Sequence, residues 1–276
     1  MPDSNTSPPS VVVGIDGSEA AIQAAQWAVD EAVSREIPLR LVQVIPEKVE
    51  PAPPAAIGNV RLELEYAETA LRIASAAVEA TGKRVKVETE ILQGDPAATL
   101  IAESRDAEMI CVGSVGIGRF ARALLGSTAA ELAEAARCPV AIIRTRQRQP
   151  KPDSALIVVA VGDSPNSDQV VEQAIEEARL RQAPVLAVGV LQKDTGDITS
   201  DELKRRVRRW GERHPGAKIY AGATRSEIAD FLAVMDRTIQ LAVIGSTDAD
   251  QVTRLIGPHR HPVLGHAECS VLVVRS

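Results

Sequence analysis

The chain has 276 residues and a formal net charge of −6, with 45% hydrophobic, 25% charged and 2% aromatic residues. This composition is ordinary for a globular protein. The acidic excess argues against nucleic acid as a partner, because phosphate binding needs a basic face. No apolar run approaches the roughly 20 residues that cross a bilayer, so we expect no membrane partner. With few aromatic residues, the core must consist of Val, Ile, Leu and Ala, which is typical of buried parallel strands.

Residues 1–10 are polar and rich in proline and serine, with no hydrophobic core of an export signal, and we predict a disordered terminus there. The three cysteines, Cys111, Cys138 and Cys269, stand at unrelated spacings. Two of them lie in or beside predicted strands, which is typical of small buried apolar residues in a reducing compartment. We therefore expect a cytoplasmic protein.

Strand-like and helix-like segments alternate along the first half of the chain. Helices are expected after Ser18 and Asp95, whose side chains can cap a first turn, and after Ser127. A long helix is expected over residues 61–80, whereas residues 47–58, dense in proline and alanine, are expected to form a loop or crossover. The apolar runs predict strands at residues 11–15, 39–45, 85–92, 109–112 and 139–143.

The second half of the chain repeats this order. Residues 156–161 correspond to residues 11–15, and residues 241–246 correspond to residues 110–114. Self-similarity over half a chain indicates a duplicated domain.

We therefore predict two domains, residues 11–146 and 154–276, joined by a polar linker at residues 147–153. Alternating strands and helices with right-handed crossovers predict an α/β fold in which each domain is a doubly wound, five-stranded parallel sheet. Such sheets bind ligands beyond the carboxyl ends of their strands, where the strand order reverses.

A glycine pattern follows the fourth predicted strand. Gly113 and Gly116 are followed, after nine residues, by Gly126-Ser127-Thr128. Glycine lets a backbone come close to a ligand, and the last three residues open a helix whose free N–H groups favour a phosphate. The pattern is not a P-loop, because no lysine follows the last glycine. It predicts a phosphate-binding turn.

This G-x2-G-x9-G-[S/T] pattern matches that of ATP-binding universal stress proteins, and the chain resembles a tandem member of that family. The resemblance implies a flavodoxin-like fold of the adenine nucleotide alpha hydrolase type, with strand order 3-2-1-4-5. It implies ATP as the ligand, together with Mg or Mn, and leaves AMP and cyclic AMP as alternatives. The nucleotide-site residues that it implies are Gly14, Ile15, Asp16, Val44, Val112, Gly113, Gly116, Gly126, Ser127 and Thr128.

Two features of this site have alternative interpretations. Asp16 could cap the following helix, bind a ribose hydroxyl or ligate a metal held by phosphates, and the resemblance favours a place at the nucleotide. Arg119 and Arg122 fall inside the nine-residue loop, where they could approach phosphate, although a solvated loop charge is the simpler interpretation.

The second half carries an incomplete copy of the pattern. Gly162 stands opposite the first-strand acid, and Asp248 takes the place of Gly116. Pro258 and His259 replace the Ser-Thr pair, and proline lacks the N–H that a phosphate needs. We expect this half to bind no ATP in the manner of the family.

Two further clusters receive simple interpretations. The altered loop holds His259, His261 and His266, but no cysteine or acid at a matching spacing supports a metal site, so we interpret it as a loop. The basic residues of the run 204–209 are interpreted as a solvated helix face.

These features predict a regulatory protein that senses or stores adenine nucleotide. The alternatives are a slow ATPase or phosphotransfer enzyme, for which we find no convincing general base, and an interaction scaffold without nucleotide. The resemblance also implies that the closing strands, residues 140–143 and 271–274, pair within the chain as a pseudo-dimer, with a homodimer as a further assembly.

Overall fold

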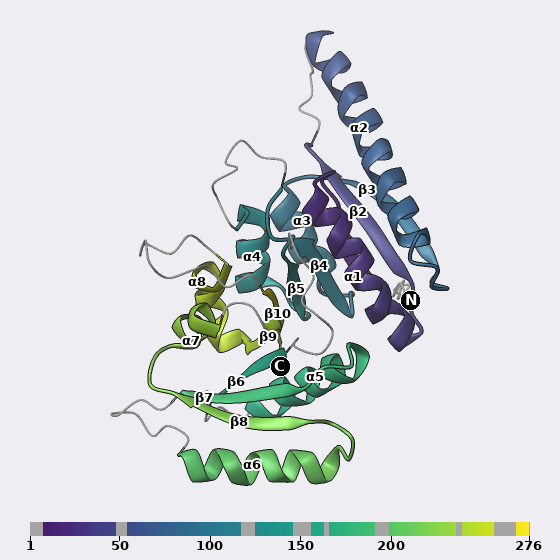
Figure 1. The fold of residues 1–276 in the computed structure, drawn as a ribbon. Coiled ribbons are helices and arrows are strands. Elements are labelled where there is room, and N and C mark those ends of the chain that lie inside the picture. The colour runs from purple at the N-terminus through teal and green to yellow at the C-terminus, as the bar shows by residue number, and fades with distance from the viewer. Residues whose placement is uncertain are drawn as a thin grey trace, which may run out of the picture. The chain divides into compact units, whose positions relative to one another are not determined.

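The computed structural model describes residues 8–47, 54–116, 125–145, 156–162, 166–190, 199–235, 239–256 and 269–275. The chain divides into two compact units, Met1–Thr145 and Arg146–Ser276. Within the described residues, each unit has five parallel strands with helices between them (Figure 1). The predicted α/β class and the duplication are confirmed.

The first unit follows the predicted alternation of strands and helices. Its strands pair in parallel in the order β3-β2-β1-β4-β5, as the resemblance implied. The order reverses between β1 and β4, which places the ligand crevice of such a sheet at their carboxyl ends. The elements are β1 (Val11–Gly14), α1 (Glu19–Arg35), β2 (Leu39–Ile45), α2 (Pro54–Glu79), β3 (Val87–Gln93), α3 (Pro96–Glu103), β4 (Met109–Gly113), α4 (Ser127–Ala135) and β5 (Val140–Ile143).

Two helix starts agree with the predicted capping. The Ser18 hydroxyl accepts a hydrogen bond from the Ala21 N–H at 3.2 Å, and the Asp95 carboxylate accepts one from the Ala98 N–H at 2.9 Å. The predicted loop at residues 47–58 was wrong in part, because α2 begins at Pro54. Proline is tolerated in a first helical turn, where its missing N–H has no intrahelical partner to lose.

The core of the first unit is built from small and branched apolar side chains. Ala67, Ala74 and Val78 on α2 are buried against the sheet, and the three valines of β1 are fully buried. Order begins before β1, because Ser10 is buried and its carbonyl accepts a hydrogen bond from the Glu108 N–H at 3.0 Å. The predicted disorder at residue 10 therefore does not hold, and residues 1–7 lie outside the described part.

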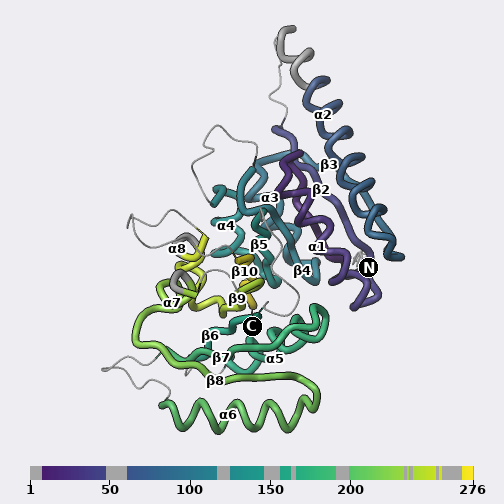
Figure 2. Tube along the Cα trace, viewed as in Figure 1, coloured from purple at the N-terminus to yellow at the C-terminus, as the bar shows by residue number. Residues whose placement is uncertain are grey.

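The second unit repeats the first in its topology. Its strands pair in the order β8-β7-β6-β9-β10, which matches the order β3-β2-β1-β4-β5 of the first unit strand for strand (Figure 2). Its elements are β6 (Leu156–Val161), α5 (Ser167–Leu180), β7 (Val185–Val190), α6 (Ser200–Arg213), β8 (Ile219–Thr224), α7 (Ile228–Met235), β9 (Ile239–Gly245), the 3-10 helix η2 (Ser246–Gln251), α8 (Val252–Ile256) and β10 (Ser270–Val274).

All three cysteines are buried, as predicted. Within the described ranges, no helix is both long enough and apolar enough to span a membrane.

Candidate functional site

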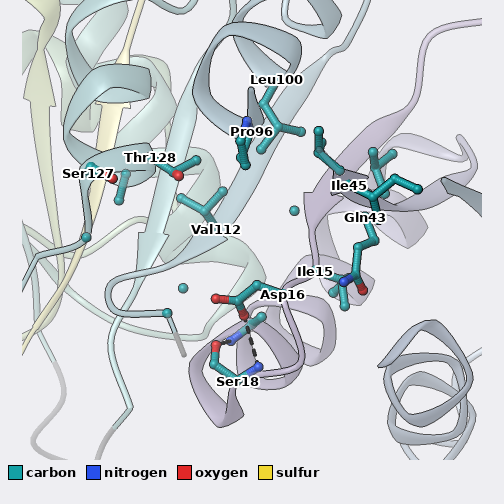
Figure 3. A pocket seen from close by; sticks show the side chains of 18 of the residues that line it. Ile15, Asp16, Ser18, Gln43, Ile45, Pro96, Leu100, Val112, Ser127 and Thr128 are labelled. Atoms are coloured by element: carbon teal, nitrogen blue, oxygen red, sulfur yellow. Dashed lines mark hydrogen bonds between the residues drawn. The ribbon is translucent and has the colours of Figure 1, made fainter. Parts of the chain in front are cut away.

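The carboxyl ends of β1, β2 and β4 surround a cavity of about 940 Å³ in the first unit (Figure 3). The N-terminal turns of α3 and α4 and part of α2 complete its wall. This is the place where a doubly wound sheet binds ligands. Every residue that the sequence predicted for the site lines this cavity: Gly14, Ile15, Asp16, Val44, Val112, Gly113, Gly116, Gly126, Ser127 and Thr128.

Asp16 joins the first-strand turn to the glycine loop. One carboxylate oxygen accepts a hydrogen bond from the Ser18 N–H at 2.9 Å, so the capping role is present. The other oxygen lies so close to Gly116 that any Cβ there would collide with it. The Ser18 hydroxyl also lies 3.4 Å from the Val115 carbonyl oxygen, to which it donates. The turn and the loop therefore form one wall of the cavity.

The N-terminus of α4 forms another part of the wall. Gly126 is the N-cap of α4 and, having no side chain, makes no capping hydrogen bond to the N–H groups of the first turn. The Gly126 N–H itself donates to the Ser114 carbonyl at 2.7 Å, which holds the helix start against the end of β4. Ser127 and Thr128 face the cavity in Figure 3. Uncapped N–H groups, a helix dipole and two hydroxyls are suited to bind an anion.

The glycines of the pattern serve different purposes. A Cβ on Gly113 would lie 2.7 Å from the backbone carbon of Ala20 and 2.8 Å from the Ala21 nitrogen. The packing of α1 therefore requires a glycine at position 113, which also lines the cavity. At Gly126 the backbone φ is −76°, and the nearest atom to a Cβ would be the Ser114 oxygen at 3.7 Å. Among the described residues, neither backbone strain nor packing requires a glycine at this position.

Sequence reasoning missed the side chain that crosses from α2 to this site. The Tyr66 hydroxyl donates to the Asp16 carbonyl oxygen at 3.0 Å and lies over Gly17, whose φ is +85°. A Cβ on Gly17 would collide with that hydroxyl. The helical period identified the buried stripe of α2, but no local signal shows what the adjoining face covers. Other lining residues that were missed include Ser18, Gln43, Ile45, Leu62, Glu63, Pro96 and Leu100.

The second unit has a pocket of only about 40 Å³ at the corresponding strand ends. The chain after β9 coils at once into η2 and α8, which contact β9 and β10. Asp248, in the place of Gly116, accepts a hydrogen bond from the Gln251 side-chain amide at 3.1 Å. Burial raises the pKa of Asp248, and the nearby Asp250 raises it further, while a hydrogen bond with Thr247 acts in the opposite direction. In its ionised form, the Asp248 carboxylate repels an anionic ligand.

The interpretation of the basic residues of α6 as a solvated helix face was wrong for Arg206. Its side chain is only 11% exposed. Its guanidinium donates to the Gly162 carbonyl at 3.1 Å and to Asp168 at 3.0 Å, and it lies 5.2 Å from the ring centre of Trp210. Gly162 stands where Asp16 stands in the first unit, so Arg206 makes the contact that Tyr66 makes there. The rest of the run is mostly exposed.

Several predicted features lie outside the described residues. These are Arg119 and Arg122, the replaced pair Pro258 and His259, and the remaining histidines of that loop, His261 and His266. Within the described part of the chain, no group of three or more His, Cys, Asp or Glu side chains could hold a metal ion.

The family model of the universal stress proteins matches the chain twice, at residues 9–144 and 156–275. The chain therefore belongs to the universal stress protein family. It is 53% identical over 266 residues to universal stress protein Rv2624c of Mycobacterium tuberculosis strain H37Rv, a match that covers 96% of both chains. It is 43% identical over 272 residues to Rv2028c of the same strain, covering 97% of this chain and 96% of that one.

A solved structure shares the fold across both units. The crystal structure of a universal stress protein from Archaeoglobus fulgidus matches with a TM-score of 0.70 at 19% identity, covering 96% of each chain.

Proposed function

We propose that the first unit binds ATP and that the protein acts as a nucleotide-dependent regulator. One observation carries this proposal: Asp16, Gly116 and the uncapped start of α4 meet around a single cavity of about 940 Å³. These parts come from three separate chain segments, and each suits a different part of a nucleotide. An apolar cavity with a few converging polar groups is the usual form of a ligand site.

The wall chemistry suggests how ATP lies. Val44, Ile45, Pro96 and Leu100 offer apolar contact to the adenine ring. The turn Gly126-Ser127-Thr128 offers N–H and hydroxyl donors to phosphate oxygens. Asp16 would bind a ribose hydroxyl or hold Mg or Mn between its carboxylate and the phosphates, since hard cations prefer oxygen ligands. AMP and cyclic AMP fit the same apolar and donor groups.

The same wall argues for binding without efficient turnover. Within the described lining, the ionisable side chains are Asp16, Glu63 and Tyr66, and no lysine, arginine or histidine is present. Phosphoryl transfer depends on cationic groups and metal ions that neutralise the developing charge. We therefore propose a regulatory protein with, at most, slow metal-dependent hydrolysis.

Calorimetry on the nucleotide-stripped full chain tests the proposal, with ATP, AMP and cyclic AMP as titrants. Gly126→Val should abolish ATP binding and leave the circular dichroism spectrum unchanged, because the new side chain occupies the approach to α4. Gly245→Ala, at a glycine of the second unit, is a control, since its Cβ would make only ordinary contacts, the nearest at 3.4 Å. The absence of binding by all three nucleotides to the unmodified chain would contradict the proposal.

We also propose that the two domains span residues 11–146 and 154–276 and that the protein is cytoplasmic. We further propose that β5 pairs with β10 as a pseudo-dimer, with a homodimer beyond it. The pairing follows from the cost of leaving apolar edge strands uncovered. Crosslinking between cysteines introduced along the two strands would test it.

A further inference from the structure

Gln43 is a buried polar residue in the wall of the cavity. It lies on β2, is only 6% exposed, and is flanked on its strand by apolar residues such as Val42 and Val44. Its side-chain oxygen is buried and has no hydrogen-bond partner in the described part of the chain. A buried acceptor without a partner is costly, and native proteins rarely keep one. A group that the ligand supplies would explain it.

The second unit shows that the fold does not need this side chain. In the first unit Val11 pairs with Leu39, and in the second unit Ile157 pairs with Val185. Counting along both strands from these pairs places Gly189 at the position of Gln43. The unit with a pocket of only about 40 Å³ thus has no side chain there.

The chemistry of a carboxamide limits what can pair with it. It presents one acceptor beside one donor in a single plane, so the best partner offers a donor beside an acceptor. Phosphate oxygens offer no donor. The edge of adenine does, because its 6-amino group lies beside the ring nitrogens N1 and N7, and glutamine pairs with adenine in this bidentate way in other complexes. In Figure 3, Gln43 lies across the cavity from Ser127 and Thr128, at the end lined by Ile15 and Ile45.

We propose that the Gln43 carboxamide recognises the adenine edge, with its oxygen accepting from the 6-amino group and its nitrogen donating to a ring nitrogen. Gln43 is then the residue that makes the site specific for the base, while the α4 turn holds the phosphates. This inference rests on the proposed function, because it assigns one end of the same site.

A thermodynamic cycle that combines a protein substitution with the removal of a ligand group tests this proposal. Calorimetry would measure ATP and purine riboside 5′-triphosphate, which lacks the 6-amino group, on the full-length chain and on Gln43→Leu. In the unmodified chain, loss of the amino group should weaken binding about 10-fold to 100-fold. In Gln43→Leu, ATP should weaken by a similar factor, and the two nucleotides should bind equally well. The coupling between the two changes is the signature of direct contact.

Two further measurements separate this role from a structural one. Without nucleotide, Gln43→Leu should melt at the same or a higher temperature, since an apolar side chain replaces an unpaired polar one. Gln43→Glu keeps an acceptor for the amino group but loses the donor to the ring nitrogen, so it should lie between the other two proteins in its preference for ATP.

The outcomes are distinct. If Gln43→Leu still prefers ATP as strongly as the unmodified chain does, the backbone of β2 recognises the base and this inference is overturned, although the site remains a nucleotide site. If the unmodified chain binds neither triphosphate, the proposed function fails and this inference fails with it.

Discussion

The two units have one topology but differ more than twentyfold in the volume beyond their strand ends, about 940 Å³ against about 40 Å³. In the first unit, β4 leads into Ser114-Val115-Gly116, and Gly116 lies against the Asp16 carboxylate in the cavity wall. In the second, β9 leads directly into η2, where Asp248 is held by Gln251. The comparison shows that a sheet can be duplicated faithfully while the cavity at its strand ends is not, because different residues determine each.

In both units, a side chain of the helix between the second and third strands donates a hydrogen bond to the turn after the first strand, but the donor group differs. Tyr66 donates to the Asp16 carbonyl from α2, and Arg206 donates to the Gly162 carbonyl from α6. In the first unit this contact borders a cavity that Asp16 and Tyr66 both line. In the second, the guanidinium is also paired with Asp168. The turn is therefore held by its neighbour helix whether or not a ligand site remains.

The largest expected difference is in nucleotide stoichiometry. The full chain should bind one ATP, because the second unit has exchanged the glycine beside its turn for Asp248 and the Ser-Thr pair for Pro258 and His259. Each charge-assisted hydrogen bond to phosphate is worth roughly 1.5–3 kcal/mol, so losing two weakens binding at least about a hundredfold. Calorimetric titration measures the ratio directly. A ratio of two, with matched affinities, would remove the functional distinction between the units.

The next largest effect concerns a pair of corresponding glycines. Gly113→Ala should destabilise the chain by about 1–3 kcal/mol, since its Cβ would meet the α1 backbone at Ala20, and overpacking of this kind costs that much. Gly245→Ala should change stability by less than about 0.5 kcal/mol, because its Cβ would make only ordinary contacts. Urea unfolding compares the two variants. Equal effects would show that α1 and α5 pack equally closely on their sheets.

A smaller effect is expected at the crossover contact. Tyr66→Phe removes the hydroxyl that donates to Asp16, which should cost about 0.5–1 kcal/mol of stability, at the low end for a hydrogen bond because the residue is 45% exposed. It should also weaken ATP binding, since the turn that carries Asp16 becomes less well held. Tyr220→Phe, at a tyrosine that is 54% exposed on β8, is the matched control and should change neither measurement.

The smallest effect is a pH dependence in the second unit. Burial raises the pKa of Asp248, so the folded state disfavours its ionised form, and stability is lost as the pH rises through that pKa. Asp248→Asn should therefore raise the melting temperature slightly at pH 7. Near pH 3, below the ordinary aspartate pKa of about 3.9, both proteins are neutral at this position and the difference should shrink. A difference that grew toward low pH would reverse the sign of this argument.

Much of the fold and the position of the candidate site could be predicted from the sequence. Strands and helices followed from local patterns, such as the apolar runs of β1 and β4 and the capping residues Ser18 and Asp95. The candidate nucleotide site followed from one glycine pattern, whose residues all line the cavity. The start of α2 could not be placed, because a proline that can begin a helix also occurs in loops.

The sequence by itself determined the duplicated α/β class, the glycine pattern and the incomplete copy of that pattern in the second half, because each depends on residues close together in the chain. Only the tertiary structure decided which side chains meet: Tyr66 with the Asp16 turn, Arg206 with Gly162, and Gly113 with the backbone of α1. It also revealed the amide oxygen of Gln43 in the cavity wall, which has no hydrogen-bond partner among the described residues. Such contacts join distant segments, and the packing of helices on the sheet, not any local pattern, brings them together.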